Sequence, residues 1–542
     1  MRCDKPRLLC MRIGFKNGRA WLLPLTSVLV AGVMISGCAQ GSIEPVAISP
    51  SAAPVPKGLE DFYLQKVSWQ TCEDDKDYQC ATVQAPLDYD DPAGRRIDLA
   101  LKKLPASSGK PIGSLLVNPG GPGGSGVEYI SEKEAFTKNL RRSYDIIGFD
   151  PRGVGKSTPL TCLSPRKITE VTEAVKKGEN PQGAEGSAES EEDSAQGAAA
   201  SAGELVTACE QNSAQGLLDH MGTASVAKDM DMLRALAGDS KLHYFGASYG
   251  TYLGARYAEI FPGNVGRMVL DSAQDPSLQH AQLSIDQAAA LERALGAYIE
   301  SCQAGFGCPL TGDFEEGRAK LKELIDRADA EPIPVGESGE VLSGQDMVTG
   351  IGNLLYDDRA WPELNEALSK AMTDNDATAL NDLINPKDPD ESPEEAARKL
   401  ANQAAERAVD CQDYPVKGDH ATWEAEAARI KEIAPIMGAG LAYQDAFCQG
   451  WGHHSGHEPA ELSLTGTAPI LVLGVTGDPA TPYEWAQRLA SQLESGRLVT
   501  VTGNGHGAYQ RLGDCVNDTV DTYLLRGELP GEDLTCEGEL QK

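Results

Sequence analysis

The sequence has 542 residues, of which 41% are hydrophobic and 24% are charged, so the chain has the composition of a globular protein and exceeds the length of one typical domain. Its formal net charge is -32 at pH 7. A surface of this sign repels the phosphate backbone of nucleic acids, so we expect no nucleic-acid partner.

The N-terminus has the pattern of an export signal. Basic residues from Arg2 to Arg19 precede an apolar run from Trp21 to Met34, which is shorter than the ~20 residues of a membrane-spanning helix. The letters ISGC follow and end at Cys38, and they resemble the bacterial lipobox, in which the cysteine is lipidated and becomes the first mature residue. We therefore predict a lipoprotein signal peptide over residues 1–37, with an ordinary signal peptide as the alternative.

The mature protein is accordingly expected to be exported to the bacterial cell envelope. Its contact with the membrane is the lipid on Cys38, and trimming of this anchor could release it. Translation can begin at Met1 or at Met11, because the basic residues after Met11 still suffice for export. Residues 38–64, which begin with a stretch rich in Ser, Ala and Pro, are predicted to form a flexible tether.

Cysteine parity supports export. Cys3 and Cys10 leave with the predicted signal and Cys38 carries the lipid, so ten of the 13 cysteines remain. An even number in an exported chain favours disulfides. Pairing of neighbours along the chain would give five bonds, although parity alone leaves the connectivity open. The ten are Cys72, Cys80, Cys162, Cys209, Cys302, Cys308, Cys411, Cys448, Cys515 and Cys536.

A second segment of biased composition covers residues 178–203, which are acidic and rich in Gly, Ala and Ser. Such a segment has few apolar side chains to bury, so we predict a disordered surface loop. Cys162 and Cys209 lie on either side and would close its base.

Short runs of β-branched residues alternate with helical patterns, which is typical of an α/β fold with a mostly parallel central sheet. Residues 276–464 are instead dominated by Ala, Leu, Glu and Lys at helical spacing, and we predict that they form a helical cap inserted between two parts of the core, 65–275 and 465–542. The expected strands are Gly113–Val117, Tyr144–Phe149, Leu242–Phe245, Val265–Leu270, Ile470–Val475 and Leu498–Val501, and a helix is expected over Thr251–Ile260.

A motif for nucleophilic catalysis follows the third of these strands. The letters GASYG, residues 246–250, match G-x-S-x-G between a predicted strand and a predicted helix. This tight turn holds a serine in a strained, exposed position, and the flanking glycines prevent clashes. The helix N-terminus also favours developing negative charge. We therefore predict Ser248 as the nucleophile.

A serine nucleophile needs a base and a carboxylate that orients the base. Asp478 follows a late strand, and His506 lies in the letters GNGHG just after the next strand, which matches the chain order Ser, Asp, His of α/β hydrolases. We predict these two residues as the acid and the base. Asp271, which also ends a strand, is the alternative acid.

The tetrahedral intermediate of acyl transfer also needs preset donors for its oxyanion. One donor is expected to be the backbone N–H of Tyr249, directly after the nucleophile. The other is expected from the glycine-rich loop at residues 118–126, where glycines let the backbone approach a substrate closely. Gly121 is the first choice and Gly120 the second.

A histidine cluster in the letters WGHHSGHE contains His453, His454 and His457. It lacks the cysteine or carboxylate framework of a zinc site, so a solvated loop is the favoured interpretation. We expect neither a metal nor a cofactor.

Five segments together resemble the bacterial tripeptidyl aminopeptidases, exported relatives of proline iminopeptidase among the α/β hydrolases. The resemblance extends from about residue 65 to the end of the chain. It implies an α/β-hydrolase fold with a helical cap and a serine peptidase that releases short peptides from free N-termini. The segments are PGGPGGSG (119–126), GFDPRGVGKS (148–157), GASYGT (246–251), GDPATP (477–482) and GNGHG (503–507).

The resemblance carries the triad onto Ser248, Asp478 and His506 and the oxyanion loop onto Gly120 and Gly121. An aminopeptidase also needs a carboxylate for the substrate's ammonium group. Candidates come from the cap segment AVDCQDYP (408–415), and they are Asp410 and Asp413. Their alternative role is to stabilise the loop around Cys411.

The expected function is acyl-enzyme catalysis on peptide or protein N-termini, with tripeptides as products. A carboxylesterase acting on acyl esters is the alternative, because the same triad cleaves both bonds. A catalytically inactive binding lipoprotein with a hydrolase fold is a further alternative, although such a protein usually lacks a triad residue.

Overall fold

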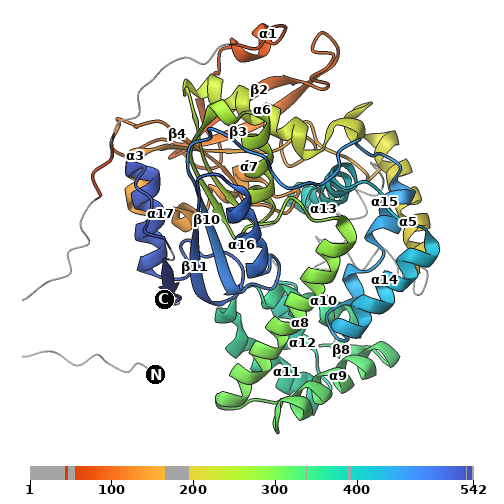
Figure 1. Ribbon diagram of the computed structural model, residues 1–542. Coiled ribbons are helices and arrows are strands. Elements are labelled where there is room, and N and C mark those ends of the chain that lie inside the picture. The colour runs from red at the N-terminus through yellow and green to blue at the C-terminus, as the bar shows by residue number, and fades with distance from the viewer. Residues whose placement is uncertain are drawn as a thin grey trace, which may run out of the picture. The chain divides into compact units, whose positions relative to one another are not determined.

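The computed structural model describes residues 43–46, 55–164, 166, 194–336, 339–386, 392–532 and 534–539 (Figure 1). The predicted signal peptide, Cys38 and residues 178–193 of the predicted acidic loop lie outside this part of the chain. Every element below belongs to one unit, which begins at Ile43.

Among the described residues, no helix combines the length and the hydropathy that a membrane span requires.

A ten-stranded sheet organises the described part of the chain, in the order β1-β2-β3-β5-β4-β6-β7-β10-β11-β12. The strands from β5 to β12 pair in parallel, whereas β1, β2 and β3 join the edge in antiparallel pairs. The expected mostly parallel α/β sheet is therefore confirmed. The strands are β1 (Gln70–Thr71), β2 (Gln79–Pro86), β3 (Arg96–Leu104), β4 (Ser114–Asn118), β5 (Asp145–Phe149), β6 (Leu242–Ala247), β7 (Val265–Asp271), β10 (Ile470–Gly477), β11 (Gly496–Asn504) and β12 (Thr535–Glu537).

Successive residues of the central strands point to opposite faces of the sheet and into two separate cores. Leu116 and Met268 belong to the cluster that includes residues of α6 (Thr223–Ala237) and α7 (Tyr249–Ile260). Their neighbours Leu115 and Val269 belong to the cluster that includes residues of α3 (Lys138–Ser143) and α17 (Asp514–Arg526). Because both faces are covered, the strands are continuous apolar runs, which is why sequence alone located them.

The helical insertion lies between β7 and β10, as predicted. These two strands pair directly, with Met268 opposite Ile470 and Asp271 opposite Leu473. The insertion has its own apolar core, built on residues such as Leu321 and Leu364. It comprises α8 (His280–Ala304), α9 (Phe314–Ala330), α10 (Gly344–Leu354), η5 (Asp358–Ala360), α11 (Trp361–Thr373), α12 (Thr378–Ile384), α13 (Pro393–Asp413), α14 (His420–Ile433), η6 (Ala439–Leu441), α15 (Gln444–Trp451) and a hairpin of β8 (Ile333–Val335) and β9 (Glu340–Leu342).

The predicted acidic loop is partly wrong. Its last residues, 195–203, belong to α5 (Ala195–Asn212), which packs against α15. A Cβ atom on Gly450 of α15 would lie 2.0 Å from the carbonyl oxygen of Ala199, so the two backbones touch. The small residues that indicated disorder are instead what allows two helices to approach so closely, with Ala195 and Ala202 buried.

The predicted tether also ends earlier than expected. Residues 60–63 form α1 (Glu60–Tyr63), with Phe62 and Tyr63 buried. The Tyr63 hydroxyl donates to Asp231 of α6 at 2.9 Å. Two adjacent aromatic side chains give this short segment enough apolar area to dock on the core.

Among the described residues there are five disulfides, and each joins cysteines that are neighbours along this part of the chain. The pairs are Cys72–Cys80, Cys162–Cys209, Cys302–Cys308, Cys411–Cys448 and Cys515–Cys536. Cys411–Cys448 joins α13 to α15 within the insertion, whereas Cys515–Cys536 joins α17 to the edge strand β12.

A buried ion pair ties the β5–α5 connection to α6. Arg152 donates to both carboxylate oxygens of Asp229, at 2.8 and 2.7 Å, and to the carbonyls of Leu87 and His220, at 2.8 and 3.0 Å. Neither charged side chain is exposed to solvent. The guanidinium is thus satisfied on every side, and loss of its carboxylate would leave an uncompensated buried charge.

We predict that Asp229→Ala lowers the free energy of unfolding by about 3–5 kcal/mol, because Arg152 then remains charged and buried without a partner. Thermal or denaturant unfolding measures the change. The matched control is Asp61→Ala, which removes the partner of Arg96 in an exposed ion pair and should leave the unfolding midpoint unchanged. Equal effects of both substitutions would contradict the prediction.

Candidate active site

Ser248 lies at a sharp turn between β6 and α7. It has φ 56° and ψ -128°, a region that non-glycine residues seldom adopt. A Cβ atom on Gly246 would lie 2.3 Å from the carbonyl oxygen of Gly250, and one on Gly250 would lie 2.7 Å from that of Asn118. The two glycines of the motif are therefore needed for the turn itself, as predicted.

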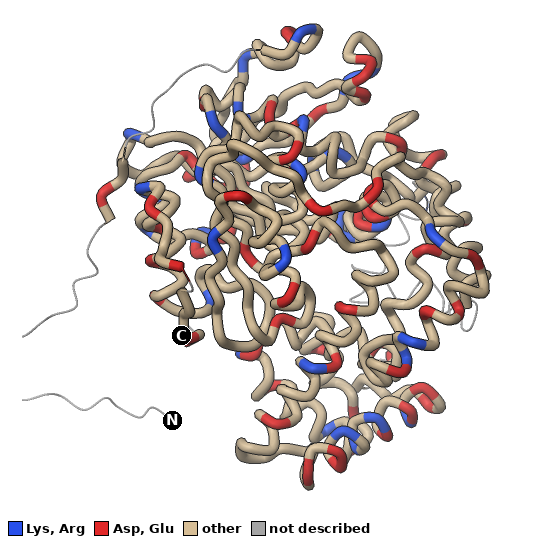
Figure 2. Tube along the Cα trace, viewed as in Figure 1, with Lys and Arg blue, Asp and Glu red and all other residues tan. Residues whose placement is uncertain are grey.

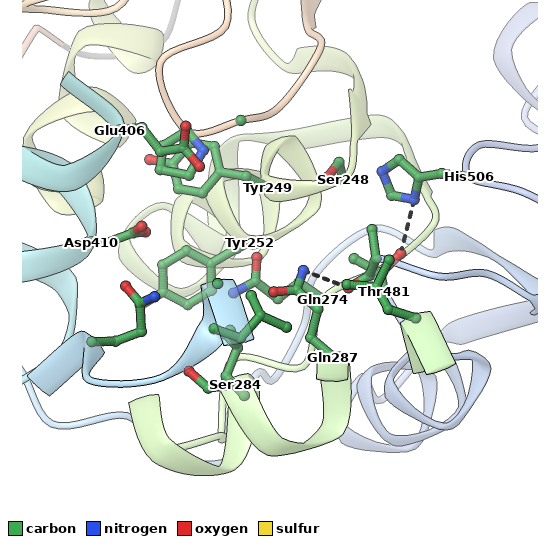
Figure 3. A pocket seen from close by; sticks show the side chains of 18 of the residues that line it. Ser248, Tyr249, Tyr252, Gln274, Ser284, Gln287, Glu406, Asp410, Thr481 and His506 are labelled. Atoms are coloured by element: carbon green, nitrogen blue, oxygen red, sulfur yellow. Dashed lines mark hydrogen bonds between the residues drawn. The ribbon is translucent and has the colours of Figure 1, made fainter. Parts of the chain in front are cut away.

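His506 and Asp478 lie together beyond the ends of β11 and β10. The Nδ1 atom of His506 is 2.9 and 3.0 Å from the two carboxylate oxygens of Asp478, which is buried. Asp478 also accepts hydrogen bonds from the backbone N–H groups of Ala480 and Thr481, both at 2.9 Å. In Figure 3 the imidazole of His506 faces Ser248, so the three predicted triad residues share one site.

The electrostatics of this pair suit a base held by a carboxylate. Burial disfavours the imidazolium, but the negative charge and hydrogen bond of Asp478 outweigh it and raise the pKa of His506. Burial likewise works against ionisation of Asp478, yet the charge and hydrogen bond of His506 hold the pKa of this carboxyl below its usual value. The carboxylate therefore stays ionised and favours the protonated imidazole.

Asp271, the alternative acid, binds backbone N–H groups instead of the imidazole. Its carboxylate accepts the backbone N–H groups of Ala508, at 3.0 and 3.1 Å, and of Tyr509, at 2.9 Å. Burial raises its pKa despite these bonds. Asp271 thus anchors the loop that carries His506, and the imidazole contacts Asp478.

Thr481 contacts both Asp478 and His506, and the sequence did not predict these contacts. Its hydroxyl lies 3.2 Å from Oδ2 of Asp478 and 3.4 Å from Nδ1 of His506. The letters GDPATP place a hydroxyl three residues after the acid, but that spacing reveals the contact only when the turn is folded.

The predicted oxyanion loop lies against the nucleophile. A Cβ atom on Gly120 would be 2.8 Å from Cβ of Ser248 and 3.2 Å from the nitrogen of Tyr249. Gly120 donates its own N–H to Oδ1 of Asn118 at 3.0 Å, whereas Gly121 lines the cavity. Tyr249 is the first residue of α7, where N–H groups have no intrahelical partner. This geometry favours Gly121 over Gly120 as the second donor.

A cavity of about 540 Å³ opens over Ser248 and His506, between the sheet and the helical insertion. The insertion contributes three carboxylates from one helix, α13: Glu406, Asp410 and Asp413. Figure 3 shows Glu406 and Asp410 on the side of Ser248 that is away from His506. Glu406 precedes the segment to which the predicted amine ligands were assigned, so sequence analysis did not name it.

The two carboxylates predicted to bind an amine have different surroundings. Asp413 accepts both the N–H and the hydroxyl of Thr223, at 2.8 and 2.5 Å, and burial raises its pKa to about 6. Burial and the neighbouring Glu406 raise the pKa of Asp410 well above its usual value. Within the described residues, no hydrogen bond engages the carboxylate of Asp410 or of Glu406, so these two remain open to a ligand.

The insertion also holds the loop of His506 directly. The backbone N–H of His506 donates to the carbonyl of Tyr356 at 2.8 Å, and the ring of Tyr356 meets the imidazole edge to face at 5.2 Å. A Cβ atom on Gly505 would lie 2.5 Å from the same carbonyl, so this approach requires glycine. Near this contact, Nη1 of Arg511 lies 3.4 Å from Oδ1 of Asp358, a residue of the insertion.

The histidine cluster has protein partners. His453 bonds to Asp219 at 2.7 Å and to Glu210 at 3.2 Å, and His454 lies 3.4 Å from the carbonyl of Cys411. Among the described residues the only group with metal-ligand spacing is Cys72, Asp74 and Cys80, and its two sulfur atoms form a disulfide.

Comparison with known proteins identifies the family of this chain. Residues 113–317 match the alpha/beta hydrolase fold, and residues 434–536 match the TAP-like protein family. The chain is 33% identical to the tripeptidyl aminopeptidase of Streptomyces lividans, over 87% of this chain and 86% of that one. The chain belongs to the tripeptidyl aminopeptidase family of α/β hydrolases.

Other members of this family have related names. The serine protease Hip1 of Mycobacterium tuberculosis is 32% identical over 87% of this chain and 91% of its own. Carboxylesterase B of the same organism is 33% identical over 95% of this chain and 98% of its own. This member of the tripeptidyl aminopeptidase family is thus an enzyme, a serine peptidase with the α/β-hydrolase fold.

We predict that turnover of a short-chain nitrophenyl ester falls at acid pH with a midpoint above 6.5, the ordinary histidine value. The neutral imidazole is the base, and Asp478 raises the pKa of His506, so protonation already removes the base at a higher pH. Asp478→Asn should lower kcat by about 10⁴-fold and move the midpoint down. A midpoint that does not move in this variant would contradict the pairing.

We predict that Tyr356→Leu lowers kcat for the same ester about threefold to tenfold, because one aromatic contact contributes about 0.5–1.5 kcal/mol to the position of His506. The matched control is Tyr298→Leu, which removes an aromatic contact with Trp361 inside the insertion. The control should lower the unfolding temperature and leave kcat unchanged. Equal kcat losses would show that Tyr356 acts only through stability.

Proposed function

We propose that this protein is an exported aminopeptidase that releases tripeptides from free N-termini through an acyl-enzyme. The observation that carries the proposal is that one cavity holds Ser248 and the His506–Asp478 pair together with two open carboxylates, Glu406 and Asp410. The first set performs acyl transfer, and the second can bind the ammonium group of a substrate.

Acylation begins when His506 removes the proton of the Ser248 hydroxyl, and the oxygen attacks the scissile carbonyl. Asp478 holds Nδ1 of the imidazole and stabilises the imidazolium that forms. The N–H groups of Tyr249 and Gly121 stabilise the oxyanion, which develops charge only in the transition state.

Acylation ends when the protonated His506 gives its proton to the leaving amine, which departs with the remainder of the substrate. Deacylation repeats these roles with water. The same imidazole takes a proton from a water molecule that attacks the acyl-enzyme. Ser248 recovers its proton when the tetrahedral intermediate collapses, and the short peptide leaves with a free carboxylate.

Glu406 and Asp410 supply the charge for substrate binding. Burial and the charge of Glu406 raise the pKa of Asp410 above its usual value. A substrate ammonium between the two groups would relieve this repulsion and stabilise both carboxylates. We assign the amine to this pair, while Asp413 stays bonded to Thr223 and joins α13 to α6.

The insertion also explains why the enzyme would act at chain ends. It covers the cavity and contributes residues on several sides of it, including Tyr356 and Asp410. A substrate that threads past both ends of the site would need space where α13 lies.

The proposed domain division is a core from 65–275 and 465–542, with residues 276–464 as the cap.

A carboxylesterase remains the second candidate, because the sequence is similar along most of its length to a protein with that name. Glu406 and Asp410 accept no hydrogen bond within the described residues and line the cavity beside Ser248, so they favour a cationic substrate over a neutral acyl ester, although Arg407 also lines this cavity. A catalytically inactive binding protein is disfavoured, because Ser248 and His506 line one cavity and Asp478 bonds to Nδ1 of His506.

We place the enzyme outside the cytoplasm, at the bacterial cell envelope. Five disulfides suit an oxidising compartment outside the cytoplasm. The signal at 1–37 and the lipid on Cys38 would hold the protein at the cell envelope, with a tether that ends before α1. Acidic positions spread over both the sheet and the cap helices in Figure 2, which opposes nucleic-acid binding.

We predict that the mature protein releases aminomethylcoumarin from tripeptides with a free N-terminus and not from the same peptides after acetylation, because acetylation removes the positive charge that Glu406 and Asp410 bind. Fluorescence release measures both rates, with Ser248→Ala as the blank. Turnover of a nitrophenyl ester without peptide cleavage would favour the esterase.

Variants of the carboxylates test the amine site. Asp410→Asn and Glu406→Gln should each raise KM for the free tripeptide about tenfold to hundredfold, as loss of a hydrogen bond to a charged group does. Glu432→Gln, an exposed position on α14, is the charge-matched control and should have the wild-type KM. A KM that all three variants leave unchanged would contradict the assignment.

A further inference from the structure

One wall of the cavity is formed by α8, the first helix of the insertion. Ser284 and Gln287 lie three residues apart, so they share one face of this helix. Both line the cavity that contains Ser248 and His506, and Figure 3 shows them among its side chains. The mechanism above assigns neither residue a role.

The hydrogen bonds of Gln287 determine which of its atoms meets a ligand. Its Nε2 donates to the carbonyl oxygen of Ala480 at 3.1 Å. A carbonyl can only accept, so the orientation of the carboxamide is forced. The Oε1 atom is left without a donor among the described residues, and it is an acceptor available to the cavity.

Ser284 has the same arrangement. Its hydroxyl donates to the carbonyl oxygen of His280 at 3.2 Å, in a bond within the helix. In this bond the proton points to an obligate acceptor, and the lone pairs of Oγ are available to a ligand. Gln274, on the adjacent wall, donates its Nε2 to the hydroxyl of Tyr414 at 2.7 Å.

The Oε1 atom of Gln287 and the Oγ atom of Ser284 are two acceptors on this wall with which the N–H groups of a ligand can pair. A peptide brings one N–H per residue, whereas an acyl ester brings none. When a bound ligand excludes water, an acceptor left unpaired loses its hydration without compensation, at a cost of about 1–3 kcal/mol. Ser284 and Gln287 therefore favour a peptide over an ester of equal size.

We propose that Ser284 and Gln287 form a subsite that accepts backbone N–H groups of the peptide substrate and makes the enzyme prefer peptides to acyl esters. The inference rests on the proposed aminopeptidase function, and it names residues that recognise the main chain rather than the N-terminus. The subsite is independent of the amine pair, because α8 and α13 are different helices.

A structural role for Gln287 predicts a different result. Its bond to Ala480 lies two residues from Asp478, so Gln287 also joins α8 to the turn of the acid. If that were its whole role, a substitution would slow peptides and esters equally, because both need the triad. A recognition role changes their ratio.

The test compares Gln287→Met with the wild type on a free tripeptidyl aminomethylcoumarin and on a nitrophenyl ester. The ratio of the two kcat/KM values, peptide over ester, should fall about threefold to tenfold, as loss of one hydrogen bond does. Ser284→Ala should lower the ratio in the same direction. The matched control is Gln282→Met on the same helix, where the carboxamide bonds to Asp286 outside the cavity lining; its ratio should equal that of the wild type.

The substrate can be changed instead of the protein. Two tripeptide analogues, each with one internal amide replaced by an ester, lack one N–H donor apiece. The wild type should process at least one of them about threefold to tenfold more slowly than the peptide, as coumarin release reports. Gln287→Met should show no further loss with that analogue, because the partner of the missing N–H is already absent.

The outcomes separate this inference from the proposed function. An unchanged ratio in both Gln287→Met and Ser284→Ala, or an equal loss on both substrates, would overturn the subsite. Failure of the wild type itself to cleave the free tripeptide would instead overturn the aminopeptidase function. Ester turnover and the unfolding temperature of each variant establish that it is folded.

Discussion

The direct pairing of β7 with β10 is the constraint on which the rest of the structure depends. The insertion leaves the sheet after Asp271, at the carboxyl end of β7, and returns at Ile470, at the start of the neighbouring strand β10. The turns that carry Ser248, Asp478 and His506 lie at the carboxyl ends of β6, β10 and β11. A helical domain with its own apolar core contacts these turns, as the bond from His506 to Tyr356 shows, and it encloses the cavity.

This arrangement makes the cap part of the active site. Tyr356 accepts the backbone N–H of His506, and α13 brings Glu406 and Asp410 to the far side of the nucleophile. Cys411–Cys448 and the Asp413–Thr223 bonds join α13 to α15 and to α6. Ion pairing stabilises the charged forms of Asp478 and His506, whereas burial raises the pKa values of Glu406 and Asp410.

The errors of sequence analysis have separate physical causes. Residues 195–203 were predicted to be disordered because small side chains bury little area, yet in α5 the same small side chains let its backbone touch Gly450. The tether was extended through α1, although Phe62 and Tyr63 dock on the core. The edge strands β1 and β12 and the antiparallel strands β2 and β3 were not predicted, because they lack the continuous apolar run of the central parallel strands.

The sequence by itself determined the features that are local in the chain: the turn at Ser248, the glycine loop, the order of Asp478 and His506 after late strands, and the parallel sheet. Each depends on the backbone demands of a few adjacent residues, which composition and spacing express. Only the tertiary structure decided which groups meet across long separations. Thr481 beside His506, Tyr356 beneath it, and the division between the bonded Asp413 and the open Asp410 follow from how helices and turns pack, and no short-range pattern encodes that packing.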